Sequence, residues 1–373
     1  MSWRSVIGQE RVKEILQRSL SAKRVAHAYL FHGPEGVGKD AMAIEMAKVL
    51  NCERGSVEPC DECGGCQRTA SLQHPNIRIV FALPVGKGEK VGDPPLLRLR
   101  DEEIRLIQEQ VRLKAENPYH RFSIPRANFI KISSIRDLRR EATLTAFGSG
   151  KKVFVISDAD NMNDEASNSL LKSLEEPTAS TMFILTSPNR PKLLPTIVSR
   201  CQNIQFDLLR DGDICEALIE RQRRTEADAS VIARLAHGSY TRALDLLTTE
   251  VRELREQAVN FIRAAMGFPS FELTEEVERI ASEHDRATVE QFLVLMLIWF
   301  RDALNLQRRG VEGIVNVDES ETLMRFSKRF PQADVGGAIR SVEKSLLLLG
   351  KNVYIRLVLM NLGLELRRTV AAK

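Results

Sequence analysis

Up to about residue 206, short apolar runs alternate with segments whose apolar residues recur every three or four positions. The runs are typical of buried strands, and the recurring spacing is typical of amphipathic helices. The predicted strands lie at 28–31, 74–81, 128–132, 151–160 and 181–187. The predicted helices lie at 5–20, 41–50, 135–147 and 166–177. Because strands that alternate with helices usually form a parallel sheet covered by helices, this region is predicted to be an α/β domain.

Two other parts of the chain depart from this alternation. Residues 84–126 begin with a run rich in proline, glycine and lysine and continue as a charged helical segment. We interpret them as an insertion made of a loop, an exposed helix and a second loop, and we expect it to touch no motif. From about residue 207 the strand-like runs disappear, and the rest of the chain has helical spacing. The pattern predicts short helices over 207–250 and long apolar helices over 251–373.

Composition narrows the class of protein without identifying it. Hydrophobic residues make up 43% of the 373 positions, and the net charge of +4 does not by itself indicate a nucleic-acid partner. No apolar run approaches the roughly 18 residues that cross a bilayer, and the N-terminal segment has no signal-peptide core. We therefore expect a cytoplasmic protein without a membrane partner, whose six cysteines stay out of disulfides.

The stretch GPEGVGKD, residues 33–40, has the spacing of a phosphate-binding loop in all but its last residue. Gly33, Gly36 and Gly38 would let backbone N–H groups face phosphates, and Lys39 would reach the outer phosphates. The last position normally carries a hydroxyl that binds Mg²⁺, but here it is Asp40. A carboxylate there adds negative charge beside a triphosphate, so the loop is built while its metal ligand is altered.

A second acidic motif, at the end of a hydrophobic strand, supplies the other metal ligand in enzymes with such a loop. The candidate is VFVISDAD, where Ser157 takes the position of the metal-binding Asp and Asp158 that of the catalytic Glu. Asp160 is a displaced substitute, or simply a polar residue after a strand. Since both metal positions are altered in one chain, we predict that hydrolysis is lost.

Four cysteines lie close together in the run CERGSVEPCDECGGC, with the spacing C-x7-C-x2-C-x2-C. Each C-x2-C step allows two thiolates to bind one ion, and four thiolates form a closed tetrahedral zinc site. A closed site leaves no open coordination position, so the zinc is predicted to be structural. The ligands would be Cys52, Cys60, Cys63 and Cys66.

These motifs occur in one order along the chain: VIGQERV, GPEGVGK, the four cysteines, NSLLKSLEEP and TIVSRC. In this order they resemble the clamp-loader subunits of the bacterial DNA polymerase III holoenzyme, which are members of the AAA+ superfamily. The resemblance is strong over 1–206 and moderate over 207–250, whereas 251–373 matches only in being helical. It implies an AAA+ (RecA-like) domain at 1–206, a helical lid at 207–250 and a helical oligomerisation collar at 251–373.

The resemblance also assigns roles to residues. The motor subunits of that family carry Thr, an Asp-Glu pair and a lid arginine where this chain has Asp40, Ser157-Asp158 and Thr241, with Arg242 one position later. The chain is therefore more similar to the stationary subunit, whose partners are the motor and delta subunits of a hetero-pentamer and, through it, the sliding clamp and primer-template DNA. In the family the arginine of SRC, here Arg200, reaches the ATP bound by a neighbouring subunit.

Alternatives remain open at this stage. Val6, Ile7 and Gln9 lie where the family packs adenine, so ATP or ADP binding without hydrolysis and plain helix-start roles are both possible. Glu175 and Glu176 are expected to be structural rather than catalytic. An active motor-type ATPase, in which Asp40 and Asp158 or Asp160 bind Mg²⁺ in an unusual way, is the alternative function. A DNA-touching zinc module is a weaker one, because its loop is acidic.

Overall fold

The computed structural model describes residues 3–90, 92–148, 150–178, 180–248, 251–267, 271–309, 314, 319–351 and 353–370. The chain divides into two compact units, which are described separately below. The first comprises Met1–Arg224 with His237–Arg242, and the second comprises Thr225–Ala236 with Ala243–Lys373. The end of the predicted lid (249–250) and parts of the predicted collar (268–270, 310–313, 315–318, 352 and 371–373) lie outside the described residues.

The first unit is built on a parallel sheet, as the strand pattern predicted. Its strand order is β2-β3-β4-β1-β5, and β5 was not among the predicted strands. Its strands are β1 (Ala28–His32), β2 (Ile77–Val80), β3 (Lys152–Ile156), β4 (Thr181–Ser187) and β5 (Gln202–Gln205). The central strands β3 and β4 are buried along their whole length, because helices cover both faces. Sheet register pairs Ala28 with Phe183 and Val153 with Met182.

The predicted strand at 128–132 is wrong. Only Ile130 makes a strand-like pairing, an isolated bridge to Met162, and a helix already begins at Ile132. Lys131 immediately precedes that helix, and its buried ammonium donates to the carbonyls of Pro84 and Pro95. The segment is thus held by side-chain contacts to the insertion instead of by a ladder of backbone hydrogen bonds.

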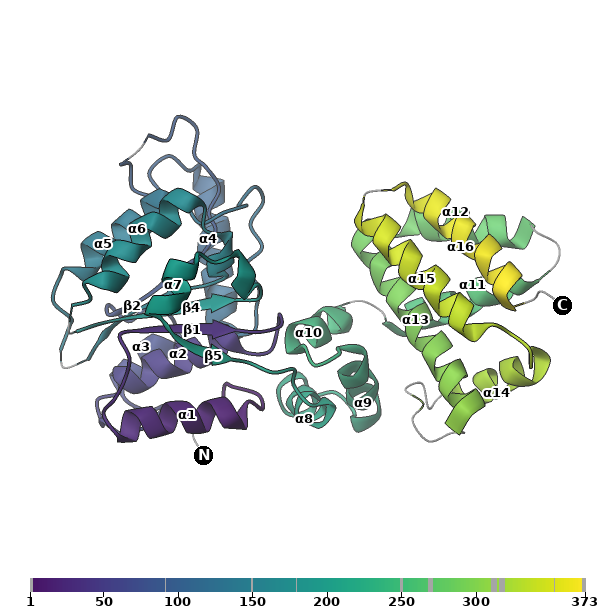
Figure 1. Ribbon diagram of the computed structural model, residues 1–373, viewed down its shortest axis with the longest axis horizontal. Coiled ribbons are helices and arrows are strands. Elements are labelled where there is room, and N and C mark those ends of the chain that lie inside the picture. Colours follow the sequence, from purple (N-terminus) through teal and green to yellow (C-terminus); the bar gives the residue numbers. More distant parts are fainter. Residues whose placement is uncertain are drawn as a thin grey trace. The chain divides into compact units, whose positions relative to one another are not determined.

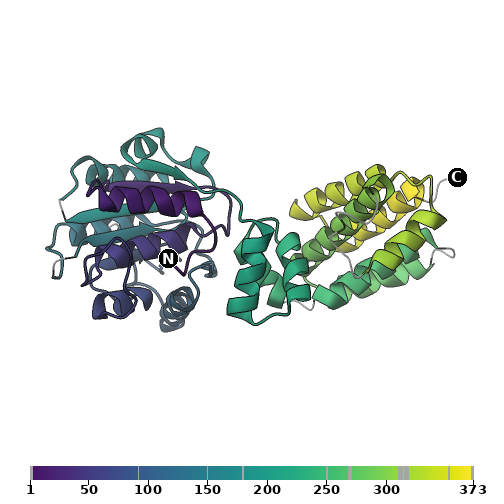
Figure 2. The ribbon, with the colours of Figure 1, turned by 90° about the horizontal axis from the view of Figure 1, so that it is seen from below.

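Helices cover the sheet on both sides (Figures 1 and 2). One face packs against α5 (Ile132–Ala142), α6 (Asp164–Glu175) and α7 (Pro195–Arg200), through a core that includes Phe154, Phe183 and Leu170. The other face carries α2 (Lys39–Leu50), with α1 (Glu10–Ser21) and α3 (Gly64–Ala70) on the same side in Figure 1. Short 3-10 turns, η1 (Ala159–Asn161) and η2 (Arg190–Lys192), follow β3 and β4.

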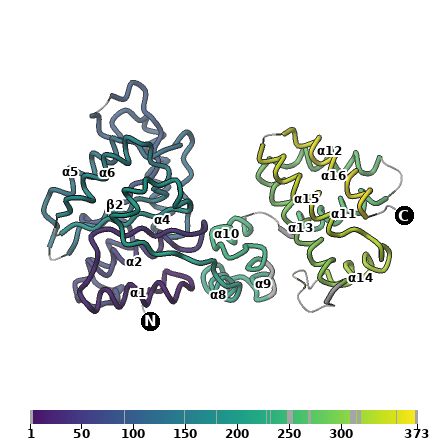
Figure 3. The backbone as a smooth tube through the Cα atoms, viewed as in Figure 1, coloured from purple at the N-terminus to yellow at the C-terminus, as the bar shows by residue number. Residues whose placement is uncertain are grey.

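The insertion forms a long loop after β2, then helix α4 (Asp101–Glu116), then a loop that leads to α5 (Figure 3). The helix was predicted, but the prediction that it is exposed is wrong, because one side of it is buried. Ile107 and Leu99 pack with Phe81 and Leu83, which directly follow β2, and Phe122 stacks on Phe81 with ring centroids 3.9 Å apart. Lys114 of α4 is also buried. The insertion therefore has its own small apolar core beside the sheet edge.

In the rest of the chain, the elements that the structure describes are all helices. The elements are α8 (Asp211–Gln222), α9 (Glu226–Leu235), α10 (Tyr240–Thr248), α11 (Val251–Met266), α12 (Phe271–Glu283), α13 (Arg286–Arg309), α14 (Ser320–Arg329), α15 (Val335–Gly350) and α16 (Ile355–Val370). In the second unit, α13 packs against α11, α14 and α15, and α16 packs against α11, α12 and α15. Among the described residues, no helix is both long and apolar enough to cross a bilayer.

Candidate functional site: an altered phosphate-binding loop

The predicted phosphate-binding loop joins β1 to α2, in the strand–loop–helix order that such loops require. Gly33, Gly36 and Gly38 all have positive φ, at 146°, 75° and 98°. A β-carbon at Gly33 would lie 2.3 Å from the carbonyl oxygen of Phe206, and one at Gly36 would lie 2.0 Å from the hydroxyl of Ser239. Glycine is required here for backbone conformation and for close approach to neighbouring segments.

Lys39 turns back onto its own loop. Its ammonium donates hydrogen bonds to the carbonyls of Gly33, at 2.9 Å, and Pro34, at 2.5 Å. The side chain is buried, and this burial lowers the pKa of Lys39 even though Asp40 and Asp158 act in the opposite direction. The cation that would bind phosphate is therefore partly satisfied by the loop itself.

Asp40 accepts three hydrogen bonds from three separate parts of the chain. Its carboxylate lies 2.6 Å from the ammonium of Lys114, 2.7 Å from the hydroxyl of Ser157 and 2.7 Å from the hydroxyl of Thr186. Ser157 occupies the predicted metal-ligand position after β3, so the two altered metal positions bond directly to each other. Lys114 comes from the insertion. The expectation that the insertion touches no motif is wrong, because α4 lies against the phosphate-binding loop.

The ammonium of Lys114 is enclosed by the protein. Only 4% of its side chain is exposed, and besides Asp40 it donates to the carbonyl of His120 at 2.7 Å and lies 5.3 Å from the ring centre of Phe122. Burial alone would raise the pKa of Asp40, but the charge of Lys114 and the hydrogen bonds from Lys114, Thr186 and Ser157 outweigh it and lower that pKa. The pair is thus a buried ion pair with its remaining polar atoms satisfied.

Tyr119, from the loop after α4, covers the phosphate-binding loop. A β-carbon at Gly38 would lie 2.6 Å from the phenol oxygen of Tyr119, and the same oxygen accepts the backbone N–H of Ile7 at 2.8 Å. The carbonyl of Tyr119 accepts the hydroxyl of Thr241 at 2.9 Å. The backbone N–H of Tyr240 donates to the carbonyl of Gly36 at 2.9 Å. Residues predicted to contact nucleotide are therefore in contact with the insertion.

The remaining predicted nucleotide residues lie at the same site. Val6 and Ile7 are buried, and the side chain of Gln9 donates to the carbonyls of Val37 and Asp207. Asp158 has φ 50°, and burial followed by the charge of Asp40 raises its pKa to about 6. Asp160 accepts a hydrogen bond from Ser187 at 2.8 Å. Among the described residues, the space left between the loop and the insertion has a volume of about 50 Å³.

Lys114, Tyr119 and Thr186 were missed by sequence reasoning. The signal for Lys114 is its place on α4: it lies seven residues after the buried Ile107 and three after Val111, so a lysine falls on the apolar side of an amphipathic helix. Nothing in the sequence indicated which residue it would meet, because Asp40 is 74 positions away.

The four predicted metal ligands do converge. One sulfur atom from each of the four cysteines lies within 4.8 Å of the others. The sulfurs of Cys60 and Cys66 are 3.9 Å apart, close to the roughly 3.8 Å edge of a tetrahedron with 2.3 Å metal–sulfur bonds. The backbone N–H groups of Cys63 and Cys66 donate to the sulfurs of Cys60 and Cys63, respectively. This group could hold a metal ion.

The polar contacts of Arg200 are with residues outside the phosphate-binding loop. It is the last residue of α7, and its guanidinium lies 2.7 Å from the carboxylate of Glu175, the last residue of α6. It also donates to the carbonyl of Thr196 at 3.1 Å. About a third of its side chain is exposed, at 36%.

Comparison with known proteins identifies the family. Residues 8–210 match the family model described as "DNA polymerase III, delta subunit". The chain belongs to this family. The delta' subunit of Bacillus subtilis DNA polymerase III is 27% identical over 98% of this chain and 99% of its own length. The resemblance to the delta' subunit, which the altered residues favoured over the motor subunits, is thus confirmed.

Other relatives of this family member belong to the same polymerase. The tau subunit of Bacillus subtilis DNA polymerase III is 27% identical over 91% of this chain but only 57% of its own length. Among solved structures, a DNA polymerase III gamma subunit-related protein from Thermotoga maritima matches with a TM-score of 0.40 and 14% identity, covering 96% of this chain and 99% of that chain.

Proposed function

We propose that this protein is a stationary, non-hydrolysing subunit of the bacterial sliding-clamp loader. Membership of the DNA polymerase III delta subunit family supports the clamp-loader part. The non-hydrolysing part rests on one observation: the ammonium of Lys114 lies 2.6 Å from Asp40, at the position that should help to bind Mg²⁺. Hydrolysis by such loops depends on a metal ion that bridges the phosphates and neutralises their charge.

The contacts around Asp40 support this loss in physical terms. A Mg²⁺ ion requires near-octahedral oxygen ligands at about 2.1 Å, and it is reluctant to lose its waters. Asp40 already neutralises a buried ammonium and accepts the hydroxyls of Ser157 and Thr186. To bind Asp40, the metal would have to displace Lys114 and leave a second cation beside it.

Arg200 is the residue that this subunit would offer to a neighbour. An arginine supplied in trans stabilises the charge of the phosphoryl-transfer transition state and is worth about 10³–10⁵ in rate. Its partial exposure and its ion pair with Glu175, at 2.7 Å, fit a group that exchanges one anion for another. Surface ion pairs of this kind contribute only about 0–1 kcal/mol, so releasing Arg200 costs little.

Assembly with motor and delta subunits would use the predicted helical lid (207–250) and collar (251–373). Contact with primer-template DNA is supported by a cavity of about 410 Å³ between α5 and α6. Its lining includes the four basic side chains Arg136, Arg139, Arg140 and Lys172. Basic groups of this kind contact phosphates without reading sequence.

The cysteine group is proposed to hold a structural Zn²⁺. Four thiolates form a closed tetrahedral site with no free position for substrate, and such a site stabilises a short segment that has little core of its own. Cys60 and Cys63 lie in an irregular stretch before α3 (Gly64–Ala70), where few apolar side chains are available.

The decisive experiment measures DNA-stimulated ATP hydrolysis by the chain alone and by the complex with its motor and delta subunits. Arg200→Ala should lower hydrolysis by the complex at least tenfold while the complex still assembles on a sizing column. The matched control is Arg18→Ala, which removes another exposed arginine that pairs with a glutamate. It should leave the rate unchanged.

Robust hydrolysis by the chain alone, abolished by Lys39→Ala, would support an active motor-type subunit instead. Equal rates for the complexes with wild type and Arg200→Ala would remove the role of Arg200 and leave only membership of the complex.

A further inference from the structure

The insertion occupies the place where a nucleotide and its metal ion would bind. We infer that Lys114 and Tyr119 act as a built-in occupant of this pocket, which joins the phosphate-binding loop to its neighbouring segments without any ligand. This inference rests on the proposed stationary role and adds a cause for it. The subunit would keep one local structure at this site whether or not ATP is present.

Lys114 supplies a positive charge beside the phosphate-binding loop. In proteins with an active phosphate-binding loop, the residue after the loop lysine and the acidic residue after the strand of the second motif, which corresponds to β3 here, share one cation, the metal ion. Here Asp40 pairs with the ammonium of Lys114, and Ser157 donates a hydrogen bond to the same carboxylate. This ammonium is shielded from solvent, since only 4% of the Lys114 side chain is exposed.

Little space remains between the phosphate-binding loop and the insertion. The phenol of Tyr119 lies against Gly38, where a β-carbon would come within 2.6 Å of its oxygen. The space that remains, about 50 Å³, is far below the roughly 300 Å³ or more that ligand pockets usually provide. Arg121 forms an ion pair with Glu35 at 2.8 Å across the same opening. The phosphates of a nucleotide have no room unless this part of the insertion moves.

Tyr119 connects segments that are far apart in the sequence. In the family that the sequence resembles, a nucleotide would touch the N-terminal segment, the phosphate-binding loop and the predicted lid at once. Tyr119 makes these connections with its own atoms: its phenol oxygen accepts the N–H of Ile7, and its carbonyl accepts the hydroxyl of Thr241. Its ring also meets that of Tyr240 edge-on, with centroids 5.0 Å apart.

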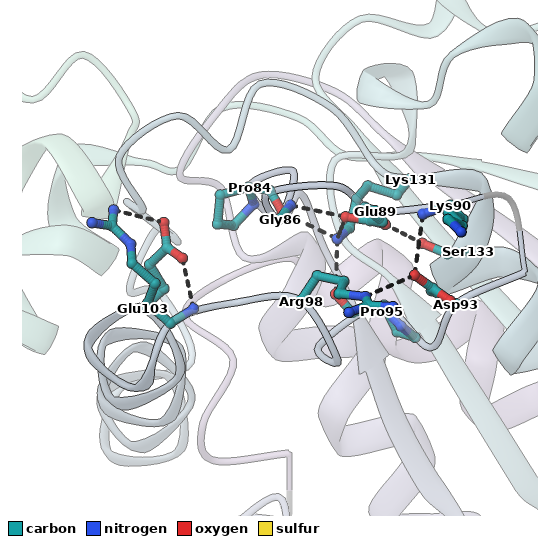
Figure 4. Close-up of polar contacts among 11 residues, drawn as sticks. Pro84, Gly86, Glu89, Lys90, Asp93, Pro95, Arg98, Glu103, Lys131 and Ser133 are labelled. Atoms are coloured by element: carbon teal, nitrogen blue, oxygen red, sulfur yellow. Dashed lines mark hydrogen bonds and ion pairs between the residues drawn. The ribbon is translucent and has the colours of Figure 1, made fainter.

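The insertion is also held near its N-terminal end by a second buried lysine, Lys131. Figure 4 shows the carboxylate of Glu89 facing Lys131, Ser133 and the N–H of Gly86. The side chains of Lys131 and Glu89 are only 4% and 10% exposed. A segment held by a buried ion pair at each end behaves as a fixed part of the domain, unlike a lid that opens for a ligand.

Hydrogen–deuterium exchange of the full-length chain tests this inference. In wild type, 1 mM Mg-ATP should change exchange by less than twofold in peptides covering 6–9, 33–41 and 238–241. In Lys114→Met/Tyr119→Ala, exchange of these peptides should rise at least tenfold. The control is Arg112→Met, which removes an exposed basic residue of α4 whose ion pairs, within the described part of the chain, are with Glu109 and Glu116 of the same helix. It should leave them unchanged.

Tyr119→Phe provides a milder variant in case the double variant does not fold. It keeps the ring over Gly38 but removes the acceptor of the Ile7 N–H, so exchange should rise in the peptide covering 6–9 and stay constant in 33–41. Unchanged exchange in both variants would overturn the inference. So would protection of 33–41 by ATP in wild type that Lys39→Ala abolishes. ATP binding without turnover would leave the stationary role intact. Turnover by the chain alone would rule out both the stationary role and the built-in occupant of the pocket.

Discussion

Replacing Lys114 by methionine should strongly destabilise the first unit, because it removes one member of a buried ion pair. The side chains of Lys114 and Asp40 are 4% and 18% exposed, and their charged atoms are 2.6 Å apart. Breaking such a pair from one side typically costs about 3–5 kcal/mol, since the other charge stays buried without its partner. The hydroxyls of Ser157 and Thr186 continue to donate to Asp40, so we expect the lower end, about 3 kcal/mol.

Asp40→Asn provides the second side of a double-mutant cycle. It leaves the ammonium of Lys114 with the carbonyl of His120 and an amide oxygen, at an expected cost of about 2 kcal/mol. In Lys114→Met/Asp40→Asn no charge is left unpaired. The double variant should therefore lose less than the sum of the single variants, by about 2 kcal/mol.

Urea unfolding followed by fluorescence measures these changes. The sequence has two tryptophans, and Trp3 is buried in the first unit whereas Trp299 lies in the second. In a Trp299→Phe background, fluorescence therefore reports the first unit, and the free energy of unfolding is extrapolated from the transition. Lys344→Met is the control: it removes an exposed ion pair to Glu365 in the second unit and should change the measured free energy by less than about 0.5 kcal/mol.

The pH dependence of the same transition is a further check. The folded state lowers the pKa of Asp40, so the pair contributes fully above the ordinary aspartate pKa, about 4, and its contribution is lost as pH falls below that value. Asp40→Asn should lack this acid-sensitive part. A cost below about 1 kcal/mol for Lys114→Met, or strict additivity in the cycle, would refute the argument that the two charges stabilise each other.

Three other changes have definite expected outcomes. Asp158→Asn should stabilise the first unit by about 1–2 kcal/mol at pH 7.5, because burial raises the folded-state pKa of Asp158 to about 6 and its ionised form destabilises the folded state. The gain in stability should fade towards pH 4, and urea unfolding at several pH values measures it. Cys63→Ser should lower bound zinc from one equivalent per chain to less than half, measured by elemental analysis, and equal zinc in both proteins would contradict the four-thiolate site. Glu175→Gln should leave ATP hydrolysis by the complex at or above the wild-type rate, since it only frees Arg200; a fall to the Arg200→Ala rate would mean that Glu175 is itself required.

The α/β fold and the phosphate-binding loop could be predicted because both depend on local signals. Apolar runs identify buried strands, and the glycines at 33, 36 and 38 mark a loop with positive φ. The predicted strand 181–187 coincides with β4 (Thr181–Ser187). The convergence of the cysteines was likewise predictable, because the closely spaced Cys60, Cys63 and Cys66 must lie near one another.

The partners of Asp40 could not be predicted, because they come from distant positions. Ser157 and Thr186 lie 117 and 146 residues further along the chain, and only the parallel order of β3, β4 and β1 brings them to the loop. The segment 128–132 was misjudged for a similar reason. Its alternating pattern suggested a strand, but the side chain of Lys131 pairs with Glu89, 42 positions earlier, and the chain enters α5 at once.

The altered positions of the loop and the insertion depend on one another. Active proteins with such a loop carry a hydroxyl at the end of the loop and a carboxylate after the strand that corresponds to β3. This chain keeps one hydroxyl and one carboxylate but exchanges their places, at Ser157 and Asp40, and Lys114 supplies the cation. Asp40→Thr alone would therefore leave a buried ammonium without its carboxylate, with the phenol of Tyr119 still against Gly38. If the chain does not hydrolyse ATP, as proposed, a single substitution is not expected to confer hydrolysis, because each change would be costly without the others.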